Sequence, residues 1–357
     1  MRPSLLSRRN RVRSGKLFRT TENPLPNRES NWQSVSAPSG GSGRCRLGSN
    51  SRLGSIPVTA TESLSVTASY NGSNAVYRIL RDSSWGPALM NLGWFTFRGP
   101  LGFLNLTTNL CDLQRSLAYR SIDLMRVQPD HDVLDIACGR GMTSYMIRRM
   151  HPGASVVGMD LLPENTQVGE TLFGNQPGLR YQQGDATALP FPDASFNRIH
   201  CLEAAFHFPN RDRFLRESGR VLRDGGRMVV VDFVWKDARF RDTRFTPAGK
   251  AVREIWQWED LFTLDDYRRY AAEGGLTMVE NYDWTHRVST PNTRLLEALV
   301  WLRRRSWGKR SMEYMNPLLR SVSEQDWAEL EDAAKAHRTM EPYCIYSTMV
   351  FEKRAKA

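Results

Sequence analysis

The segment 135–141 places an acid and two glycines between an apolar run and a helical pattern. Glycine lets the backbone approach a ligand closely and turn where larger residues cannot. The carboxylate of Asp135 precedes the turn, where it suits a ligand that carries an amino group. We therefore expect a nucleotide-binding loop formed by Ala137, Cys138, Gly139 and Gly141.

Two further acids follow at regular spacing. Asp160 ends the second apolar run, 25 residues after Asp135, and Asp185 follows the third run after another 25 residues. The carboxyl ends of parallel strands meet at one sheet edge, where ligands bind in open α/β sheets. Asp160 could accept both hydroxyls of a ribose, and Asp185 could accept a bond from an adenine amino group. Leu161 and Ala186, which follow these acids, are expected to contact the same ligand. A single acid could instead cap a helix or turn, but the ordered set favours a ligand site.

An acid and a histidine follow the fourth apolar run. Glu203 could accept the proton of a substrate hydroxyl or stabilise a carbocation, or it could make a structural or ligand-side contact. His207 could act as a base near neutral pH, or it could be a wall histidine with its hydrogen bonds satisfied. Cys201 ends the run itself, where we expect it against the ligand and not as a nucleophile.

These residues need a framework of alternating strands and helices. Short apolar runs alternate with helical patterns from residue 131 onward, which predicts a parallel sheet covered by helices on both faces. The expected strands are 131–137, 154–159, 179–182, 196–201 and 227–233, with two closing strands at 277–282 and 345–351. Helices are expected within 74–125 and at 143–150, 211–222, 246–262, 264–273, 293–308 and 323–337.

Three segments together resemble a known family. Residues 133–141 resemble the glycine motif of class I S-adenosylmethionine-dependent methyltransferases, 184–191 with Phe196 and Asn197 resemble their adenine-binding segment, and 220–227 resemble their turn before strand five. The resemblance covers about 75–355. It implies an α/β fold with a Rossmann-like, seven-stranded, mostly parallel sheet, an antiparallel last strand and helical cap insertions. It also implies S-adenosylmethionine as the cofactor.

One stretch resembles a particular subgroup of this family. Residues 201–211 are similar to the segment after strand four in sterol, tocopherol and related natural-product methyltransferases, which carry an acid and a histidine at the positions of Glu203 and His207. Residues 264–267, Gly275 and 283–285 also resemble that subgroup. This implies carbon or oxygen methylation of a small, largely apolar metabolite in secondary metabolism. No nucleic-acid partner is expected, and the oligomeric state stays open.

The positive charge is concentrated at the N-terminus. Of the net +11, residues 1–53 hold +9. We expect 1–70 to be a disordered basic tail, with an organelle transit peptide or an RNA-binding tail as alternatives. Residues 71–130 are expected to form an N-terminal helical cap, and 131–357 the methyltransferase domain, with substrate-cap helices at about 240–262 and 293–337.

The cap ranges are rich in aromatic residues, which suits a large apolar substrate but also suits simple packing. Arg303, Arg304 and Arg305 form either a solvated face or a surface that attracts a membrane or an anionic substrate.

The number and spacing of the cysteines and histidines indicate the cellular compartment and whether a metal is expected. Five widely spaced cysteines without a CxxC pair favour a reducing compartment, for which we expect the cytoplasm, or an organelle if the tail is a transit peptide. The six histidines lack metal-ligand spacing, so no metal is expected. The sequence also has no apolar run long enough to span a bilayer.

Other functions remain as rivals. A nucleic-acid methyltransferase would fit the basic tail, but residues 202–205 lack the Asp/Asn-Pro-Pro-aromatic motif of adenine-amino enzymes. A nicotinamide-dependent oxidoreductase is disfavoured because Ser144 stands where the third glycine of its fingerprint belongs. A non-catalytic binding module that keeps the fold is the third rival.

Overall fold

The computed structural model describes residues 89, 91–95, 110–258, 260–315, 319–320 and 322–354. The basic tail predicted for 1–70 lies outside these residues, as does most of the cap predicted for 71–130.

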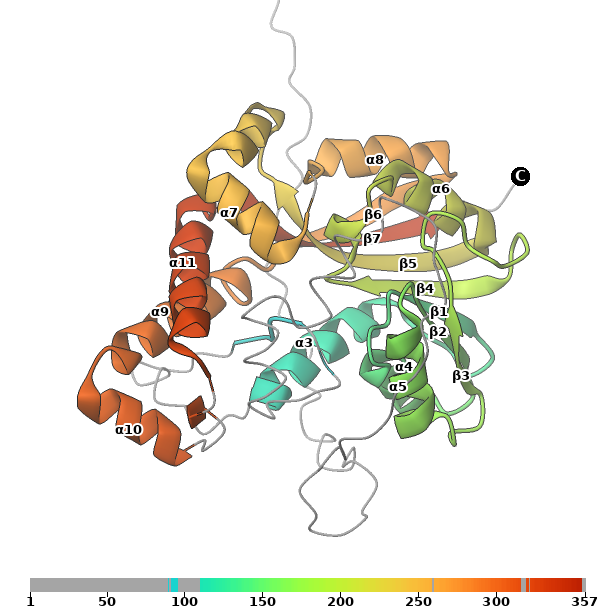
Figure 1. Ribbon diagram of the computed structural model, residues 1–357. Helices are drawn as coiled ribbons and strands as arrows, with labels where there is room; N and C mark the ends of the chain where they lie inside the picture. The colour runs from blue at the N-terminus through green and yellow to red at the C-terminus, as the bar shows by residue number, and fades with distance from the viewer. Residues whose placement is uncertain are drawn as a thin grey trace, which may run out of the picture.

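A seven-stranded sheet forms the centre of the molecule (Figure 1). Its strands lie in the order β3-β2-β1-β4-β5-β7-β6. β7 is antiparallel to both of its neighbours, and the pairs from β3 to β5 are parallel. The predicted α/β fold with an antiparallel last strand is therefore confirmed. The strands are β1 (Asp132–Ile136), β2 (Ser155–Asp160), β3 (Leu179–Gln183), β4 (Phe196–Leu202), β5 (Leu222–Trp235), β6 (Leu276–Asp283) and β7 (Cys344–Lys353).

Helices cover both faces of the sheet, because successive side chains of a strand point to opposite faces. Val133 packs toward α3 (Leu110–Leu124), α4 (Met142–Met150) and α5 (Pro163–Phe173). Its neighbour Leu134 belongs to the other apolar layer, with α6 (Arg211–Val221) and α8 (Leu264–Glu273). Both layers consist mainly of buried apolar side chains, which hold the helices against the sheet.

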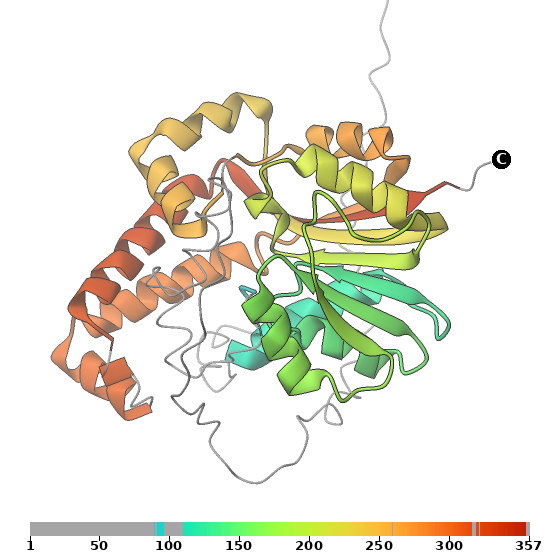
Figure 2. The ribbon, with the colours of Figure 1, turned by 45° about the vertical axis from the view of Figure 1, so that its right-hand side comes forward.

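A group of helices extends from one end of the sheet (Figures 1 and 2). It consists of the short helix η5 (Ala238–Phe245), α7 (Pro247–Trp256), α9 (Ser289–Arg303), α10 (Ser306–Met315) and α11 (Glu324–Met340), with α11 packed on α7 and α9. The helix predicted at 246–262 ends at Trp256, because Gln257 takes a left-handed conformation with φ 51°. The helix predicted at 293–308 is divided between α9 and α10.

In the described part of the chain, no helix has the length and apolar character needed to cross a bilayer. The same residues contain no group of three or more potential metal ligands.

Candidate active site

A cavity of about 380 Å³ opens at the carboxyl ends of the parallel strands. All of the predicted site residues except Gly141 and Cys201 line it. The predicted residues among its lining are Asp135, Ala137, Cys138, Gly139, Asp160, Leu161, Asp185, Ala186, Glu203 and His207.

The glycine loop between β1 and α4 is built from left-handed residues. Ala137 has φ 54°, Gly139 55° and Gly141 87°. Gly141 serves the loop by packing and not by lining the cavity: a Cβ there would lie 2.6 Å from the ring of Tyr181, whose hydroxyl donates to the Gly141 carbonyl at 2.7 Å. Ala137 takes a conformation that favours glycine, so the loop stores backbone strain at this position.

Asp160 ties the glycine loop to the end of β2. Its Oδ2 accepts from the Gly139 amide at 2.9 Å, while its Oδ1 accepts from the Leu162 amide and from Nδ2 of Asn165, both at 3.0 Å. Burial raises the pKa of this carboxyl, and the three donors oppose that shift. Because Oδ1 already accepts two hydrogen bonds and Oδ2 accepts one, Oδ2 has room for one further donor, such as a ribose hydroxyl.

Asp135 is buried beneath the loop and held from two sides. The Ser144 hydroxyl donates to its Oδ2 at 2.6 Å, and Nδ1 of His200 lies 2.9 Å from its Oδ1. Nε2 of His200 in turn lies 2.9 Å from the Ser121 hydroxyl. Nothing in the sequence pattern predicted His200 as a positioning residue. Ser144 was notable in the sequence only because it stands in place of a glycine, but in the structure the Ser144 hydroxyl orients Asp135.

Asp185 lies exposed at the rim of the cavity. Its Oδ1 accepts from the amide and the hydroxyl of Thr187, at 2.7 and 2.9 Å. This local turn fixes the carboxylate through Oδ1 and leaves Oδ2 without a hydrogen-bond partner among the described residues. Ala186 is buried behind it, and Leu161 is 42% exposed at the lip.

Glu203 follows β4 in a strained conformation, with φ 52°. Its amide donates to the Val231 carbonyl at 2.8 Å, and its carboxylate accepts from the Leu92 amide at 3.0 Å and from the Tyr346 hydroxyl. Burial raises the pKa of Glu203 to about 7, against the opposing effect of these two donors. A carboxyl with this pKa exchanges its proton near neutral pH, which suits acid–base chemistry.

His207 is a weaker candidate base. Burial lowers its pKa to about 4, so the ring is neutral at physiological pH. Its Nδ1 donates to the Gln257 carbonyl at 3.2 Å, which links the site to the end of α7. Of the two predicted catalytic residues, the structure therefore favours Glu203 for proton transfer.

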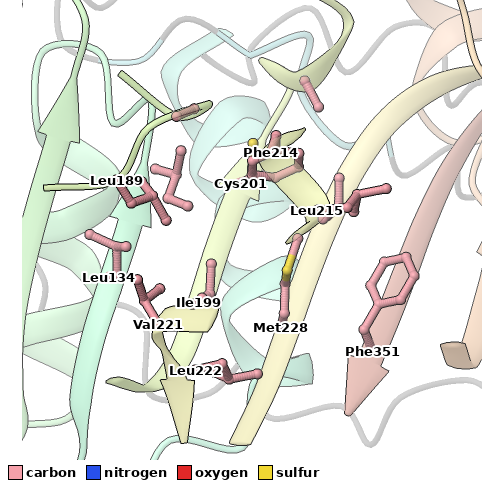
Figure 3. Packing of buried hydrophobic residues seen from close by; sticks show 14 of the residues in the cluster. Leu134, Leu189, Ile199, Cys201, Phe214, Leu215, Val221, Leu222, Met228 and Phe351 are labelled. Atoms are coloured by element: carbon pink, nitrogen blue, oxygen red, sulfur yellow. The ribbon is translucent and has the colours of Figure 1, made fainter. Parts of the chain in front are cut away.

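Cys201 does not reach the cavity. Its side chain is fully buried in the layer between the sheet and α6, near Phe214 (Figure 3). Burial raises the pKa of its thiol well above the usual range, so a thiolate is disfavoured. The expectation that Cys201 lies against the cofactor is wrong, because its position in β4 points it to the core face of the sheet.

A second, smaller cavity of about 40 Å³ lies under the cap. Aromatic side chains surround it, and His337 of α11 adds a polar group whose Nε2 has no hydrogen-bond partner in the part of the chain that the structure describes. Burial lowers the pKa of His337 to about 4, so it is neutral. The aromatic residues are Phe206, Phe233, Trp256 and Trp258, and Phe206 adjoins His207 of the larger cavity.

Comparisons with known proteins find similar sequences and similar folds. Residues 134–230 match the family model described as a methyltransferase domain. Curated relatives include Methyltransferase GfsG of Streptomyces halstedii, 29% identical over 48% of this chain and 62% of that protein. Phthiotriol/phenolphthiotriol dimycocerosates methyltransferase 1 of Mycobacterium ulcerans is 42% identical over 36% of this chain and 46% of that protein.

One further curated relative and one solved structure are also similar to this chain. 2-Methyl-6-phytyl-1,4-hydroquinone methyltransferase of Synechocystis is 29% identical over 44% of this chain and 50% of that protein. The chain thus spans between 46% and 62% of the length of these three relatives. A solved structure, a geranyl diphosphate C-methyltransferase from Streptomyces coelicolor, shares the fold with a TM-score of 0.60 at 16% identity, covering 84% of this chain and all of that one.

Residues 134–230 thus resemble a methyltransferase domain in sequence, and the seven-stranded sheet has the fold of a solved methyltransferase. The resemblance to small-molecule methyltransferases predicted from the motifs is confirmed.

Proposed function

We propose that the protein transfers a methyl group from S-adenosylmethionine to carbon or oxygen of a small, largely apolar metabolite. One observation carries this proposal. The glycine loop, Asp160 and Asp185 border one part of a single cavity, and Glu203, with a pKa of about 7, borders the same cavity. The residues proposed to bind the nucleoside and the ionisable carboxyl of Glu203 thus line the same cavity.

The residues present fit S-adenosylmethionine. Oδ2 of Asp160 has room for a ribose hydroxyl, Oδ2 of Asp185 has room for an adenine amino group, and Asp135 lies fixed beneath the loop for the amino group of the methionine part. When bound, the cofactor supplies an electrophilic methyl group on a sulfonium. Most of the catalysis then comes from positioning and desolvation.

Glu203 is proposed to act on the acceptor. Near neutral pH its carboxylate can take the proton of an acceptor hydroxyl, or stabilise a positive charge that develops on an alkene. Tyr346 and the Leu92 amide fix the carboxylate in one orientation, so little reorganisation is needed when charge develops.

The cap supports an apolar acceptor. Its cavity of about 40 Å³ has room for one small group of an acceptor and is lined mainly by aromatic and aliphatic side chains. Nε2 of His337, which has no hydrogen-bond partner among the described residues, would be a polar contact there. Two relatives are named for lipophilic substrates, phthiotriol dimycocerosates and a phytyl hydroquinone. We propose the same broad substrate class here, and a place in secondary metabolism.

We also propose a cellular location, which three of the cysteines support. Cys138, Cys201 and Cys344 are buried free thiols, which supports the proposed location in a reducing compartment, the cytoplasm. Import into an organelle directed by residues 1–70 is the alternative. Imaging the full chain fused to a fluorescent protein at its C-terminus would distinguish the two.

The test of the proposed function uses cofactor labelled in its methyl group. The protein is incubated with a lipid-soluble metabolite extract, and labelled products are identified by mass spectrometry. We expect one apolar product with the wild-type chain and a strongly reduced amount with Asp160→Ala. Binding of cofactor with no labelled product in lipid-soluble or water-soluble extracts would instead indicate a binding module.

A further inference from the structure

The outer surface of α9 and α10 combines exposed aromatic and cationic side chains. Trp301 is 51% exposed, Trp307 53% and Tyr314 85%. Figures 1 and 2 both place α10 at the end of the cap that lies farthest from the sheet. We name this surface the aromatic patch and define it as Arg294, Trp301, Arg305, Trp307, Arg310 and Tyr314.

Helical spacing brings these residues to one side of each helix. On α9, Trp301 follows Arg294 by seven positions, so the two lie on one face. Arg305 lies between α9 and α10, and its guanidinium donates to the Trp301 carbonyl at 2.7 Å. On α10, Trp307 and Tyr314 are separated by two turns, with Arg310 between them. The two faces meet where the rings of Trp301 and Trp307 pack edge to face, 6.3 Å apart.

The patch contains arginines and no acid. The guanidinium of Arg305 lies 3.4 Å from the ring centroid of Trp301, which keeps the cation beside the exposed indole. The acids of these two helices are engaged by other groups. Glu297 binds Arg338 of α11, and Glu313 lies 3.9 Å from Lys309.

The neighbouring arginines behave differently. Arg303 and Arg304 form ion pairs with Glu324 and Glu331 of α11, so they bind the cap together. Only Arg305 of this run belongs to the patch. The sequence suggested that Arg303, Arg304 and Arg305 share one role. In the structure, Arg303 and Arg304 pair with α11, and Arg305 lies beside the exposed ring of Trp301.

The geometry points to a docking surface for an anionic lipid bilayer at the aromatic patch. Indole and phenol rings favour the bilayer interface, because one part of each ring is apolar and the other can bond to water or headgroups. Arginines beside them attract anionic lipids. Trp301 and Trp307 enter the headgroup region, while Arg294, Arg305 and Arg310 contact lipid phosphates. This inference goes beyond the proposed function and does not require it.

The test measures binding of the full chain to vesicles of phosphatidylcholine with 30% phosphatidylglycerol, at about 0.1 M salt. We compare wild type with Trp301→Ser/Trp307→Ser/Tyr314→Ser and with Arg294→Gln/Arg305→Gln/Arg310→Gln. At about 1 kcal/mol per arginine, the second variant should bind about 100-fold more weakly. Loss of the aromatic rings should weaken binding about tenfold or more. The +9 tail is identical in every variant, so its contribution cancels.

Two controls make the result specific. Leu172→Ser/Phe245→Ser removes exposed apolar side chains elsewhere and should bind like wild type. Brominated lipids should quench wild-type fluorescence more than that of Trp301→Phe/Trp307→Phe. Equal vesicle binding by wild type and both patch variants would overturn the inference. A wild-type dimer that the patch variants convert to monomers, without vesicle binding, would also overturn it and assign the surface to a second copy of the chain.

Discussion

The hydroxyl of Tyr346, on β7, donates a hydrogen bond to the carboxylate of Glu203, which follows β4 143 residues earlier in the chain. β5 lies between these two strands in the sheet. The antiparallel last strand therefore brings a phenol to the proposed catalytic acid. This contact gives β7, an inner strand of the sheet, a direct part in the proposed active site.

Removal of this donor should change the pH dependence of the reaction. The Tyr346 bond lowers the pKa of Glu203, so Tyr346→Phe should raise that pKa above 7. If ionised Glu203 is the base, the rising limb of the pH–rate profile should move to higher pH, with cofactor affinity unchanged. A lower rate with an unmoved profile would limit Tyr346 to a structural role.

Glu203→Gln tests the acid–base role itself. The amide preserves size and keeps an acceptor for Tyr346, so cofactor affinity should stay at the wild-type value. The turnover rate at saturating cofactor should fall by roughly 10²–10⁴-fold, the range for loss of a positioned acid–base group. Weaker cofactor binding with a recovered rate would assign Glu203 to the cofactor instead.

Glu203 should also make stability depend on pH. Its pKa is about 7 in the folded chain and 4.5 in the unfolded reference. The folded state therefore binds the proton more tightly, and this contribution is fully present below pH 4.5 and lost as the pH rises through 7. Between pH 4.5 and 8 the wild type should lose up to about 3 kcal/mol of unfolding free energy relative to Glu203→Gln. Denaturant titrations of both proteins across this range measure the difference, and parallel curves would contradict the assigned pKa.

Ala137→Gly should stabilise the glycine loop. The left-handed backbone, with φ 54°, costs alanine about 1–2 kcal/mol, and glycine avoids this at an entropic cost of about 0.5–1 kcal/mol. The unfolding free energy should rise by roughly 0.5 kcal/mol. Ala328→Gly, on the exposed face of α11, should instead lower it by about 1 kcal/mol. Equal losses for both variants would show that the Ala137 backbone is not strained.

The sheet and its acids could be predicted because they depend on local patterns. Apolar runs bounded by turns located all seven strands, and the ends of those runs located Asp135, Asp160 and Asp185 at one cavity. A strand end determines the position of its residues without knowledge of the remaining chain. This explains why these motifs could be interpreted from the sequence alone.

The contacts around Glu203 could not be predicted in this way. Its carboxylate binds the Leu92 amide, 111 residues earlier, and the Tyr346 hydroxyl. Such pairs depend on the order of strands and on the path of the chain before α3, which leave no periodic signal. The end of α7 is a similar case, because buried Trp258 donates its indole N–H to the Val252 carbonyl and so turns the chain back.

Calorimetric titration with S-adenosylmethionine and with NAD tests the central claim, that the cavity of about 380 Å³ is a site for this cofactor, most directly. Wild type should bind S-adenosylmethionine saturably and NAD not at all. Asp160→Ala should weaken binding by about 10- to 100-fold, because one charge-assisted bond is worth about 1.5–3 kcal/mol. Glu164→Ala, an exposed acid on the first turn of α5, should bind like wild type. Saturable NAD binding without S-adenosylmethionine binding would contradict the account.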